Sequence, residues 1–347
     1  MMAEDVAGLD LARFRQWYDG QRPGEIAGEL EAELIAGGKS NLTYRVTDGS
    51  SRWIVRRPPL GHVQATAHDM GREYTAMSAL EGTGVPVPRM YARCTDPDVL
   101  GAPFYVMEQV DGSAYRHAAE LDALGAERTA ALAGRLVDVL VELHAVDPEQ
   151  VGLGEFGRPV GFLERQVRRW GKQLEGSKTQ ERPDADELHR LLTERLPAED
   201  PSVFGIVHGD YRLDNCLVAS DEHGDDQIHA VVDWEMATLG DTRTDLALML
   251  VYETLGASAA GDLVSDVAKA QGWPSNDAQL AAYTRASGRE PGDMGFHMAL
   301  AFFKLAVILE GIHYRYLQGQ TVGEGFDRIG EGFDLIIAAG LDSLKKD

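Results

Sequence analysis

The sequence predicts an α+β chain of two lobes, a small β-rich lobe at residues 1–110 and a large, mainly helical lobe at residues 111–347. Short β-prone runs separated by Gly, Asp and Ser dominate from Leu34 onward. After about residue 111, stretches with apolar residues at helical spacing replace them. The chain has 347 residues and 44% hydrophobic content, which is enough for two such lobes.

Charge and cysteine content narrow the expected partners. The formal net charge is −23, and an acidic chain repels phosphate backbones and anionic lipids, so we predict neither nucleic acid nor a membrane as partner. Cys94 and Cys216 lie far apart without a CxxC or Cys/His cluster, which argues against a zinc site or a disulfide framework. The N-terminus lacks a signal-peptide pattern, and the apolar stretch 296–309 is too short to span a bilayer. We therefore expect a soluble, cytoplasmic protein.

The elements of the small lobe are predicted in chain order. Residues 1–30 are expected to form a helical extension, because the segment 9–18 is amphipathic at helical spacing. A second helix with a glycine stop is expected at 68–84. The other segments are short, β-prone and bounded by turn residues, and strands are predicted within 33–38, 42–49, 52–58, 85–96 and 101–110.

The large lobe is predicted to consist of helices with a few short strands. Amphipathic helices are expected at 126–146 and 160–174, and the pattern is helical again from Thr242 onward. The polar stretch 176–187 is predicted to be an exposed loop. Apolar β-prone runs predict strands within 202–210, 215–219 and 228–235.

The segment "VHGDYRLDNCLV" at 207–218 is the strongest chemical signal. It holds His208, Asp210 and Asn215 in the spacing H-x-D-x4-N, and Asp233 follows at the end of an apolar β run. Phosphoryl transfer needs oxygen ligands that hold Mg²⁺ against phosphates, and one carboxylate beside the attacking hydroxyl. Asp210 suits the second role, whereas Asn215 and Asp233 suit the first. Taken singly, these are common turn residues, but their combination favours a phosphoryl-transfer site.

"HGDYRLDN" followed by "VVDWEMATLGDTRTDLA" resembles the aminoglycoside phosphotransferase and choline-kinase-like family, over residues 30 to 315 or so. The resemblance implies a two-lobed, protein-kinase-like fold, ATP and Mg²⁺ as cofactors, and a small-molecule hydroxyl as acceptor. It implies that Asp210 is the catalytic aspartate and that Asn215 and Asp233 are metal ligands. Asp245 then corresponds to an aspartate that braces the catalytic loop, and His208 supports that loop without transferring protons.

A nucleotide-binding loop is predicted within 34–46, between two β runs. Gly37 and Gly38 allow the backbone to approach phosphate oxygens, and Ser40 and Asn41 can donate hydrogen bonds to them. A Gly-Gly turn alone is an ordinary hairpin turn, and the segment lacks the G-x-G-x-x-G pattern of protein kinases.

The strand "RWIVRRPP" has no lysine, although kinases place one here on the α- and β-phosphates. Arg56 is expected in its place, since arginine grips phosphate well. Strand alternation sends Arg56 and Arg57 to opposite faces, and the sequence leaves open which one faces the phosphates. Glu73, on the following helix, is the expected ion-pair partner.

The segment "FYVMEQVDG" resembles the linker that contacts adenine in this family. Met107 is expected behind the adenine, with the Glu108 carbonyl and the Val110 amide as hydrogen-bond partners. A methionine in an apolar strand can equally be core filling.

The acceptor is predicted to be a small hydroxylated molecule, with aminoglycoside-phosphotransferase-like activity as first choice. "GGKSNLTYRV", "IVRRPP" and "FYVMEQVDG" also resemble kinase-like domains fused to acyl-CoA dehydrogenases, which phosphorylate hydroxyacyl chains. A nucleotide-binding pseudokinase is the third alternative, but the three predicted catalytic and metal residues are all present. Arg165, Arg168 and Arg169 form either a solvated face or an anion-contacting patch. An aminoglycoside needs carboxylates in its pocket, and the later segment offers Glu253, Asp262, Asp266, Glu290, Asp293, Glu310 and Glu324.

Overall fold

A computed structural model describes residues 6–35, 41–60, 69–221, 223–258, 265–319 and 329–345. The chain forms two compact units. The first comprises Met1–Ser113, Leu217–Ala219 and His229–Ala237. The second comprises Ala114–Cys216, Ser220–Ile228 and Thr238–Asp347. Two short segments late in the sequence thus belong to the first unit.

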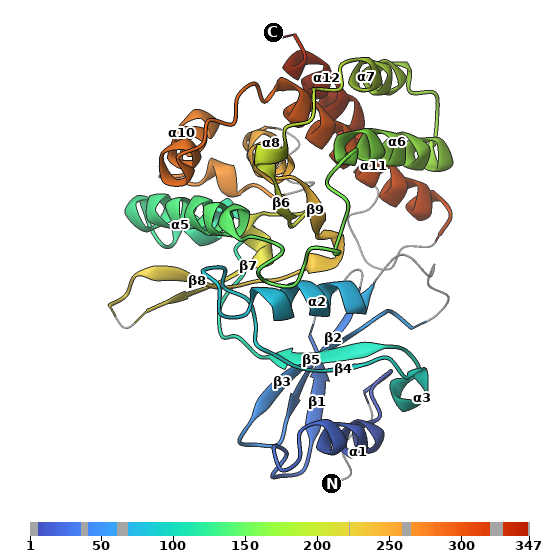
Figure 1. The fold of residues 1–347 in the computed structure, drawn as a ribbon, viewed down its shortest axis with the longest axis vertical. Coiled ribbons are helices and arrows are strands. Elements are labelled where there is room, and N and C mark those ends of the chain that lie inside the picture. The colour runs from blue at the N-terminus through green and yellow to red at the C-terminus, as the bar shows by residue number, and fades with distance from the viewer. Residues whose placement is uncertain are drawn as a thin grey trace. The chain divides into compact units, whose positions relative to one another are not determined.

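An antiparallel sheet of five strands forms the centre of the first unit, in the order β1-β2-β3-β5-β4 (Figure 1). Helix α1 (Leu11–Gln21) is capped by Asp10, whose carboxylate accepts the Arg13 amide at 2.9 Å. Short helix α3 precedes β5, and α2 carries the predicted glutamate. Their bounds are β1 (Glu31–Leu34), β2 (Leu42–Thr47), β3 (Arg52–Arg57), α2 (Met70–Leu80), β4 (Met90–Cys94), α3 (Pro97–Leu100) and β5 (Phe104–Glu108).

The alternation of β3 divides its side chains between two faces of the sheet. Trp53 and Val55 join Phe14 and Tyr18 of α1 in one buried core. Figure 1 shows α1 and α2 on opposite faces of this sheet. Arg56, one residue after Val55, therefore faces the α2 side, and this places a charged side chain beneath that helix.

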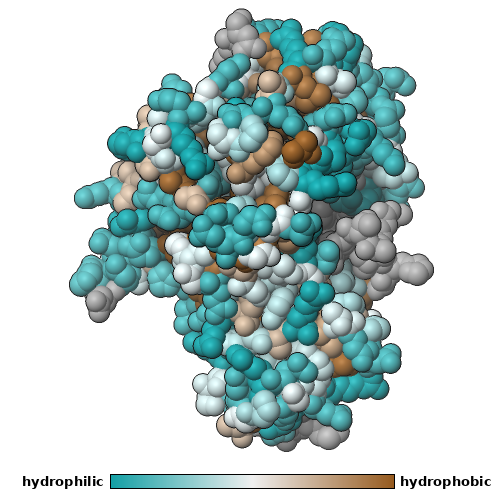
Figure 2. Space-filling view, viewed as in Figure 1, coloured by the Kyte–Doolittle hydropathy of each residue, from teal (hydrophilic) through white to brown (hydrophobic). Residues whose placement is uncertain are grey.

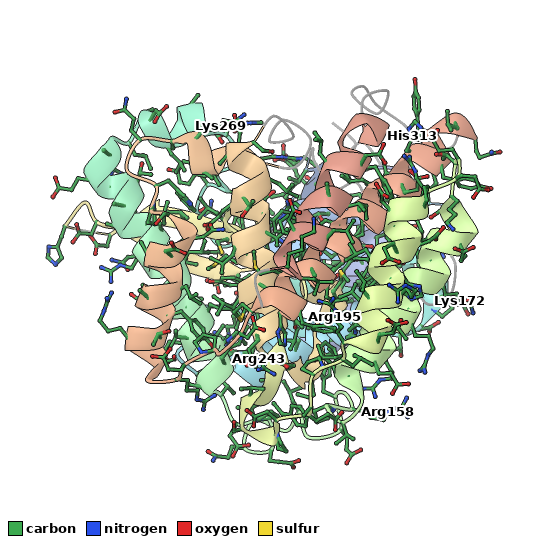
Figure 3. All side chains as sticks on the ribbon, turned by 90° about the horizontal axis from the view of Figure 1, so that it is seen from above. Arg158, Lys172, Arg195, Arg243, Lys269 and His313 are labelled. Carbon is green, nitrogen blue, oxygen red and sulfur yellow. The ribbon has the colours of Figure 1, made fainter. Side chains whose placement is uncertain are left out.

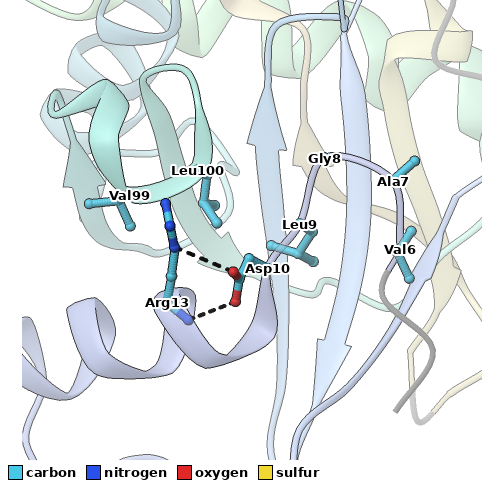
Figure 4. Close-up of a pocket in the computed structure, with 8 residues that line it drawn as sticks. All are labelled: Val6, Ala7, Gly8, Leu9, Asp10, Arg13, Val99 and Leu100. Atoms are coloured by element: carbon cyan, nitrogen blue, oxygen red, sulfur yellow. Dashed lines mark hydrogen bonds and ion pairs between the residues drawn. The ribbon is translucent and has the colours of Figure 1, made fainter. Parts of the chain in front are cut away.

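An open cleft of about 340 Å³ lies on the α1 side of the first unit, between the N-terminal segment and α3 (Figure 4). Asp10 and Arg13 form an ion pair of 3.4 Å at its edge. The Arg13 guanidinium also donates to the Asp98 carbonyl at 3.2 Å. None of the residues predicted to bind nucleotide lines it.

The second unit is mainly helical. Strands β6 and β9 form a two-stranded antiparallel sheet, and the predicted catalytic loop follows β6 directly in the chain. Strands β7 and β8 form a hairpin whose residues are divided between the two units. Their bounds are α4 (Ala118–Asp122), α5 (Ala126–Ala145), α6 (Phe162–Ser177), α7 (Pro183–Glu194), β6 (Phe204–Val207), β7 (Cys216–Ser220), β8 (Asp226–Val231), β9 (Thr238–Asp241), α8 (Arg243–Ala257), α10 (Asn276–Ser287), α11 (Gly295–Leu317) and α12 (Phe333–Ser343).

The stretch 176–187 is only in part the exposed loop that its polar composition predicts. Arg182 is 5% exposed, and its guanidinium donates to the Glu310 carboxylate at 2.8 Å. Glu310 also accepts the Thr179 amide at 2.8 Å. These bonds hold Arg182 inside the second unit, while most other residues of the stretch are exposed. The loop is also shorter than predicted, because α7 begins at Pro183.

Helix α11 is the apolar centre of the second unit and packs against α6, α8 and α12. With 23 residues it is longer than the stretch 296–309. By length and composition alone the helix could cross a membrane, so the prediction that this region is too short was wrong. However, 72% of its most apolar window is buried, as in a core helix of a globular unit. The exposed face seen in Figure 2 is mostly hydrophilic, in keeping with the high charge.

Candidate active site

The predicted catalytic loop follows β6 directly in the second unit. Asp245, in the first turn of α8, accepts the amides of His208 and Gly209 at 2.6 and 2.8 Å. Gly209 has a φ of +85°, which a glycine adopts without strain. Asp245 therefore lies where the resemblance places a brace for this loop.

Asp210 is held by donors on both carboxylate oxygens. The Tyr252 hydroxyl donates to Oδ1 at 2.7 Å, and the Asn215 amide donates to Oδ2 at 3.1 Å. Asn215 also donates to the Asp210 carbonyl at 2.8 Å, so its side-chain oxygen is the atom left for a cation. Burial alone raises the pKa of Asp210, but Arg212, Lys304 and Tyr252 outweigh it and hold the pKa below its usual value.

Three of these neighbours were not predicted from the sequence. Arg212 lies within the quoted motif, two residues after Asp210, and its guanidinium stands 4.6 Å from the centroid of the Tyr252 ring. Arg212 also pairs with Asp214 at 2.7 Å. Tyr252 and Lys304 come from α8 and α11, and no local signal marks them.

A second cluster forms in the first unit around Arg56. Its guanidinium lies 3.1 Å from the Glu73 carboxylate and 3.5 Å from that of Asp233. Arg57 points to the other face, where it donates to the carbonyls of Gly8 and Leu100, each at 2.6 Å. Arg56 is thus the arginine that lies among the acidic groups.

Glu73 is fully buried and has three polar neighbours. Besides Arg56, the Tyr105 hydroxyl and the Asn41 amide donate to its two oxygens. Burial raises the pKa of Glu73 to about 7, against the opposing effects of Arg56 and Tyr105. The amide nitrogen of Asn41 donates to Glu73 at 3.3 Å, and its contact with a phosphate stays a prediction. The other predicted loop residues, Gly37, Gly38 and Ser40, lie outside the described residues.

Asp233 stands at a strained position of the backbone. Among the residues that the structure describes, it is the non-glycine residue with positive φ, at 69°. The following turn, Trp234–Met236, packs against α2 and brings Glu235 near Glu73. Backbone strain of this kind is concentrated at functional sites.

Asp233, Glu235 and Glu73 each offer a carboxylate oxygen, and these oxygens all lie within 4.8 Å of one another. Hard oxygen donors fit Mg²⁺, which prefers carboxylates and water. Glu235 is the member of this set that the sequence did not single out, although it lies only two residues after Asp233.

The predicted adenine contacts lie at the end of β5. Met107 is buried and pairs with Ile54 and Met90 in the sheet. The Glu108 amide donates to the Arg89 carbonyl at 2.9 Å, and Val110 follows as a half-buried residue. Their contact with adenine stays a prediction.

A small cavity lies beside Tyr252 in the second unit and has a volume of about 20 Å³. This is room for about one water molecule. Glu253 lines it, is 5% exposed, and accepts a hydrogen bond from Gln279. Burial raises the pKa of Glu253 to about 8, which keeps the carboxyl protonated at neutral pH.

Comparisons with known proteins place this geometry in a family. A sequence profile of the phosphotransferase enzyme family matches residues 31–297. "Acyl-CoA dehydrogenase family member 11" of Rattus norvegicus is 36% identical over 293 residues, which cover 83% of this chain and 37% of that protein. Family member 10 of Mus musculus is 34% identical over 298 residues, which cover 85% and 27%. The chain thus spans less than half the length of these relatives. Their match confirms the predicted resemblance to kinase-like domains carried by such proteins.

Solved structures support the same assignment. A Ralstonia eutropha protein assigned as an aminoglycoside phosphotransferase superimposes with a TM-score of 0.83 and 32% identity, over 97% of this chain and 98% of that one. The GDP and kanamycin complex of APH(2″)-IIIa matches with a TM-score of 0.59 and 15% identity, over 95% and 98%, and shows the fold alone. The predicted kinase-like, two-lobed fold is confirmed. The chain belongs to the phosphotransferase enzyme family, as a kinase-type enzyme that transfers phosphate to hydroxyl groups.

Proposed function

We propose that the chain transfers the γ-phosphoryl group of ATP, bound with Mg²⁺, to a hydroxyl group of a small molecule. The arrangement of Asp210 carries this proposal. Its side chain is 24% exposed, so an acceptor can reach it, and two donors fix the direction of its carboxylate. An ionised, oriented carboxylate is what this chemistry needs beside the attacking oxygen.

Asp210 is assigned to the acceptor hydroxyl. It accepts the hydrogen bond of that hydroxyl and turns an oxygen lone pair toward the phosphorus, while the bond to the leaving phosphate oxygen breaks. The hydroxyl proton passes to Asp210 as the new P–O bond forms. The neighbouring cations keep the pKa of Asp210 low, so orientation is its larger contribution.

The Arg56 cluster is assigned to the nucleotide. Arg56 binds the α- and β-phosphates, and buried Glu73 holds its guanidinium in place. In the first unit Asp233 would hold Mg²⁺, and Glu235 offers one more carboxylate. Asn215 of the second unit stays a predicted metal ligand. When bound, the metal neutralises the charge that spreads over the transferred phosphoryl group.

Asp210→Asn tests the assignment. The amide keeps the shape of the side chain but removes its negative charge. We expect ATP consumption to fall at least about a hundredfold, while ATP affinity measured by calorimetry stays within a factor of two or so. Wild-type turnover in the variant would remove Asp210 from the reaction.

The contacts of the acidic residues of the second unit favour an acceptor that is not polycationic. Glu253 is protonated near neutral pH, and Glu310 is buried in an ion pair with Arg182. Asp266 accepts the Ala118 amide at 2.9 Å, and Asp293 accepts that of Gly295 at 2.8 Å. Glu290 is exposed, whereas Asp262 and Glu324 lie outside the described residues. Most of the described acids thus serve the fold.

Cations, in contrast, gather close to Asp210. Arg212 lies 3.7 Å from its carboxylate, and Lys304 acts on its pKa. Arg169 of α6 in turn lowers the pKa of Lys304. Arg212 occupies the carboxylates of Asp210 and Asp214, so few carboxylates are left to pair with the several ammonium groups of an aminoglycoside, whereas a neutral acceptor needs none. Together with the 36% identity to a protein named as an acyl-CoA dehydrogenase, this favours a hydroxyacyl compound as the acceptor, ahead of the aminoglycoside predicted first.

A coupled ATP-consumption screen distinguishes the acceptor classes. Hydroxyacyl thioesters, aminoglycosides and choline-like amines are tested in parallel, and each product is examined by mass spectrometry for one added phosphate. We expect phosphate on a hydroxyacyl compound, with affinity that owes much to apolar burial and changes little with salt. Phosphate appearing only on an aminoglycoside, with strongly salt-dependent affinity, would restore the aminoglycoside as acceptor.

A further inference from the structure

Lys304 lies in the second unit at a position where an ammonium group loses part of its hydration. It lies near the middle of the apolar helix α11, and its ammonium group is 5.6 Å from the centroid of the Trp170 ring. Burial lowers the pKa of Lys304, while the carboxylates of Asp210 and Asp245 oppose this. The ammonium donates a hydrogen bond to the Gly209 carbonyl. Lys304 is half-buried, and an ammonium group largely removed from water is retained where it is well paired, so this contact explains its position.

The carbonyl that Lys304 holds belongs to the peptide group between Gly209 and Asp210. The other end of the same peptide group is the Asp210 amide, which donates to His208 Nδ1 at 3.1 Å. Both ends of this peptide group are therefore hydrogen-bonded: the carbonyl to Lys304 of α11 and the amide to His208 of the loop itself. The preceding amide, that of Gly209, is tied to Asp245 of α8.

Gly209 makes this restraint necessary. With a φ of +85° and no side chain, it can turn the adjoining peptide plane more freely than any other residue. The plane ends at the α-carbon of Asp210, so its rotation swings the bond that directs the carboxylate. An error of about 1 Å in such a group can cost about a hundredfold in rate.

We infer that Lys304 is a positioning residue for phosphoryl transfer, because it fixes the Gly209–Asp210 peptide plane and thereby the direction of the Asp210 carboxylate. This rests on the proposed function, in which Asp210 orients the attacking oxygen. Lys304 acts through the backbone and touches neither ATP nor the acceptor, so its loss affects turnover and not nucleotide binding.

Steady-state kinetics with MgATP and water as acceptor tests the inference on the full chain. Lys304→Met removes the donor at similar length, and Lys304→Arg keeps a donor. We expect Lys304→Met to lower kcat about tenfold to a hundredfold, with KM and calorimetric Kd for ATP within about twofold. Lys304→Arg recovers part of the lost kcat. Exposed Lys172 on α6 (Figure 3) supplies the matched control, Lys172→Met, which leaves kcat unchanged.

Two outcomes overturn the inference. One is a Lys304→Met variant with wild-type kcat. The other is a loss of ATP affinity as large as the loss of kcat, because it means that Lys304 contacts the nucleotide.

Amide hydrogen exchange provides a readout that does not depend on activity. We expect the Asp210 amide to exchange about tenfold faster in Lys304→Met, with amides of α12 unchanged. If the Asp210 amide exchanges at the same rate in both proteins, Lys304 does not fix the Gly209–Asp210 peptide plane. If wild type consumes no ATP, the proposed function fails, and exchange still decides whether Lys304 holds the loop. If Lys304→Met does not fold, Lys304→Arg is compared with wild type instead. A partial fall in kcat with faster exchange of the Asp210 amide supports the inference, whereas unchanged kcat and exchange, or a loss of ATP affinity, overturns it.

Discussion

The hydroxyl of Tyr252 lies 2.7 Å from Oδ1 of Asp210 and donates a hydrogen bond to it, although 42 residues separate the two in sequence. This donor favours the ionised carboxylate and helps hold the pKa of Asp210 below its usual value. In Tyr252→Phe the pKa of Asp210 therefore rises. Because the reaction needs ionised Asp210, the acidic limb of the kcat–pH profile moves to higher pH. At neutral pH Asp210 stays ionised, and kcat falls about tenfold because the carboxylate loses one of the two donors that orient it.

Tyr18→Phe is the control for this prediction. It removes a comparable hydroxyl, which donates to Glu25 at 2.8 Å in the first unit. Its kcat–pH profile should match that of wild type. A wild-type acidic limb in Tyr252→Phe would show that the tyrosine does not tune Asp210.

Arg56 and Arg57 form a matched pair on opposite faces of β3. Arg56→Ala is expected to weaken ATP binding about tenfold to a hundredfold, the usual effect of losing hydrogen bonds to a charged group. Arg57→Ala loses bonds to two backbone carbonyls, so it lowers the melting temperature and leaves ATP affinity near wild type. Calorimetry and thermal melting check both, and an equal loss of ATP affinity in the two variants contradicts the assignment.

The positive φ of Asp233 gives a prediction that separates backbone strain from charge. Asp233→Gly and Asp233→Ala both remove the carboxylate, so both should lose Mg²⁺-dependent ATP turnover. The glycine variant should be more stable than the alanine variant by about 1 kcal/mol, because only alanine is strained in the left-handed region. Urea unfolding measures the difference. A more stable alanine variant would mean that Asp233 does not hold this conformation.

The Arg182–Glu310 pair is predicted to carry a large share of the stability of the second unit. Glu310 is fully buried and Arg182 nearly so, and removal of Glu310 leaves buried Arg182 with only the exposed carboxylate of Asp334, at 3.1 Å. Glu310→Ala should therefore cost about 3 to 5 kcal/mol in urea unfolding. Asp342→Ala, which breaks an exposed pair with Lys345 at 2.8 Å, should cost less than about 1 kcal/mol. Similar costs for the two variants would refute the prediction.

Glu253 predicts a pH dependence of stability. Its pKa is raised by burial to about 8 in the folded chain, against about 4.3 for an exposed glutamate. The folded state therefore keeps a proton that the unfolded state releases, and stability is lost as pH rises from about 4.5 to about 8. Glu253→Gln removes this loss, so its melting temperature should fall less than that of wild type between pH 5.5 and 8. The same slope in both proteins would show that Glu253 is ionised in the fold.

The sequence predicted most of the fold, because the local patterns of strands and helices are clear. The alternation in β3 and the glycine stop after α2 both belong to this class. What it did not reveal is that residues 217–219 and 229–237 belong to the first unit. Their place depends on backbone hydrogen bonds between distant segments, such as those from Val218 to Ser113 and from Val231 to Pro86. Such pairings leave no periodic signal.

The candidate site shows the same division. His208, Asp210, Asn215 and Asp245 lie together as the motif predicts, since they are close in sequence or fixed by one helix. The positions of Tyr252 and Lys304 were not predictable from the sequence. Both lie in apolar helical stretches, where a single polar residue is normally assigned to a helix surface.

Asn41 shows a different limit. Its contact with phosphate stays a prediction. Its hydrogen bond to buried Glu73 was not predictable, because the two residues are 32 positions apart in sequence.

Helix α11 has a consequence for the newly made chain. A segment of 23 residues with this hydropathy resembles what the translocation machinery inserts into a bilayer. Lys304 and Glu310 sit within it, and a charge near the centre of such a helix costs about 2.5 to 3.5 kcal/mol on insertion scales for Lys, Arg and Asp. Lys304 and Glu310, which bind the Gly209 carbonyl and the Arg182 guanidinium in the folded chain, therefore also oppose insertion of this helix into lipid during synthesis.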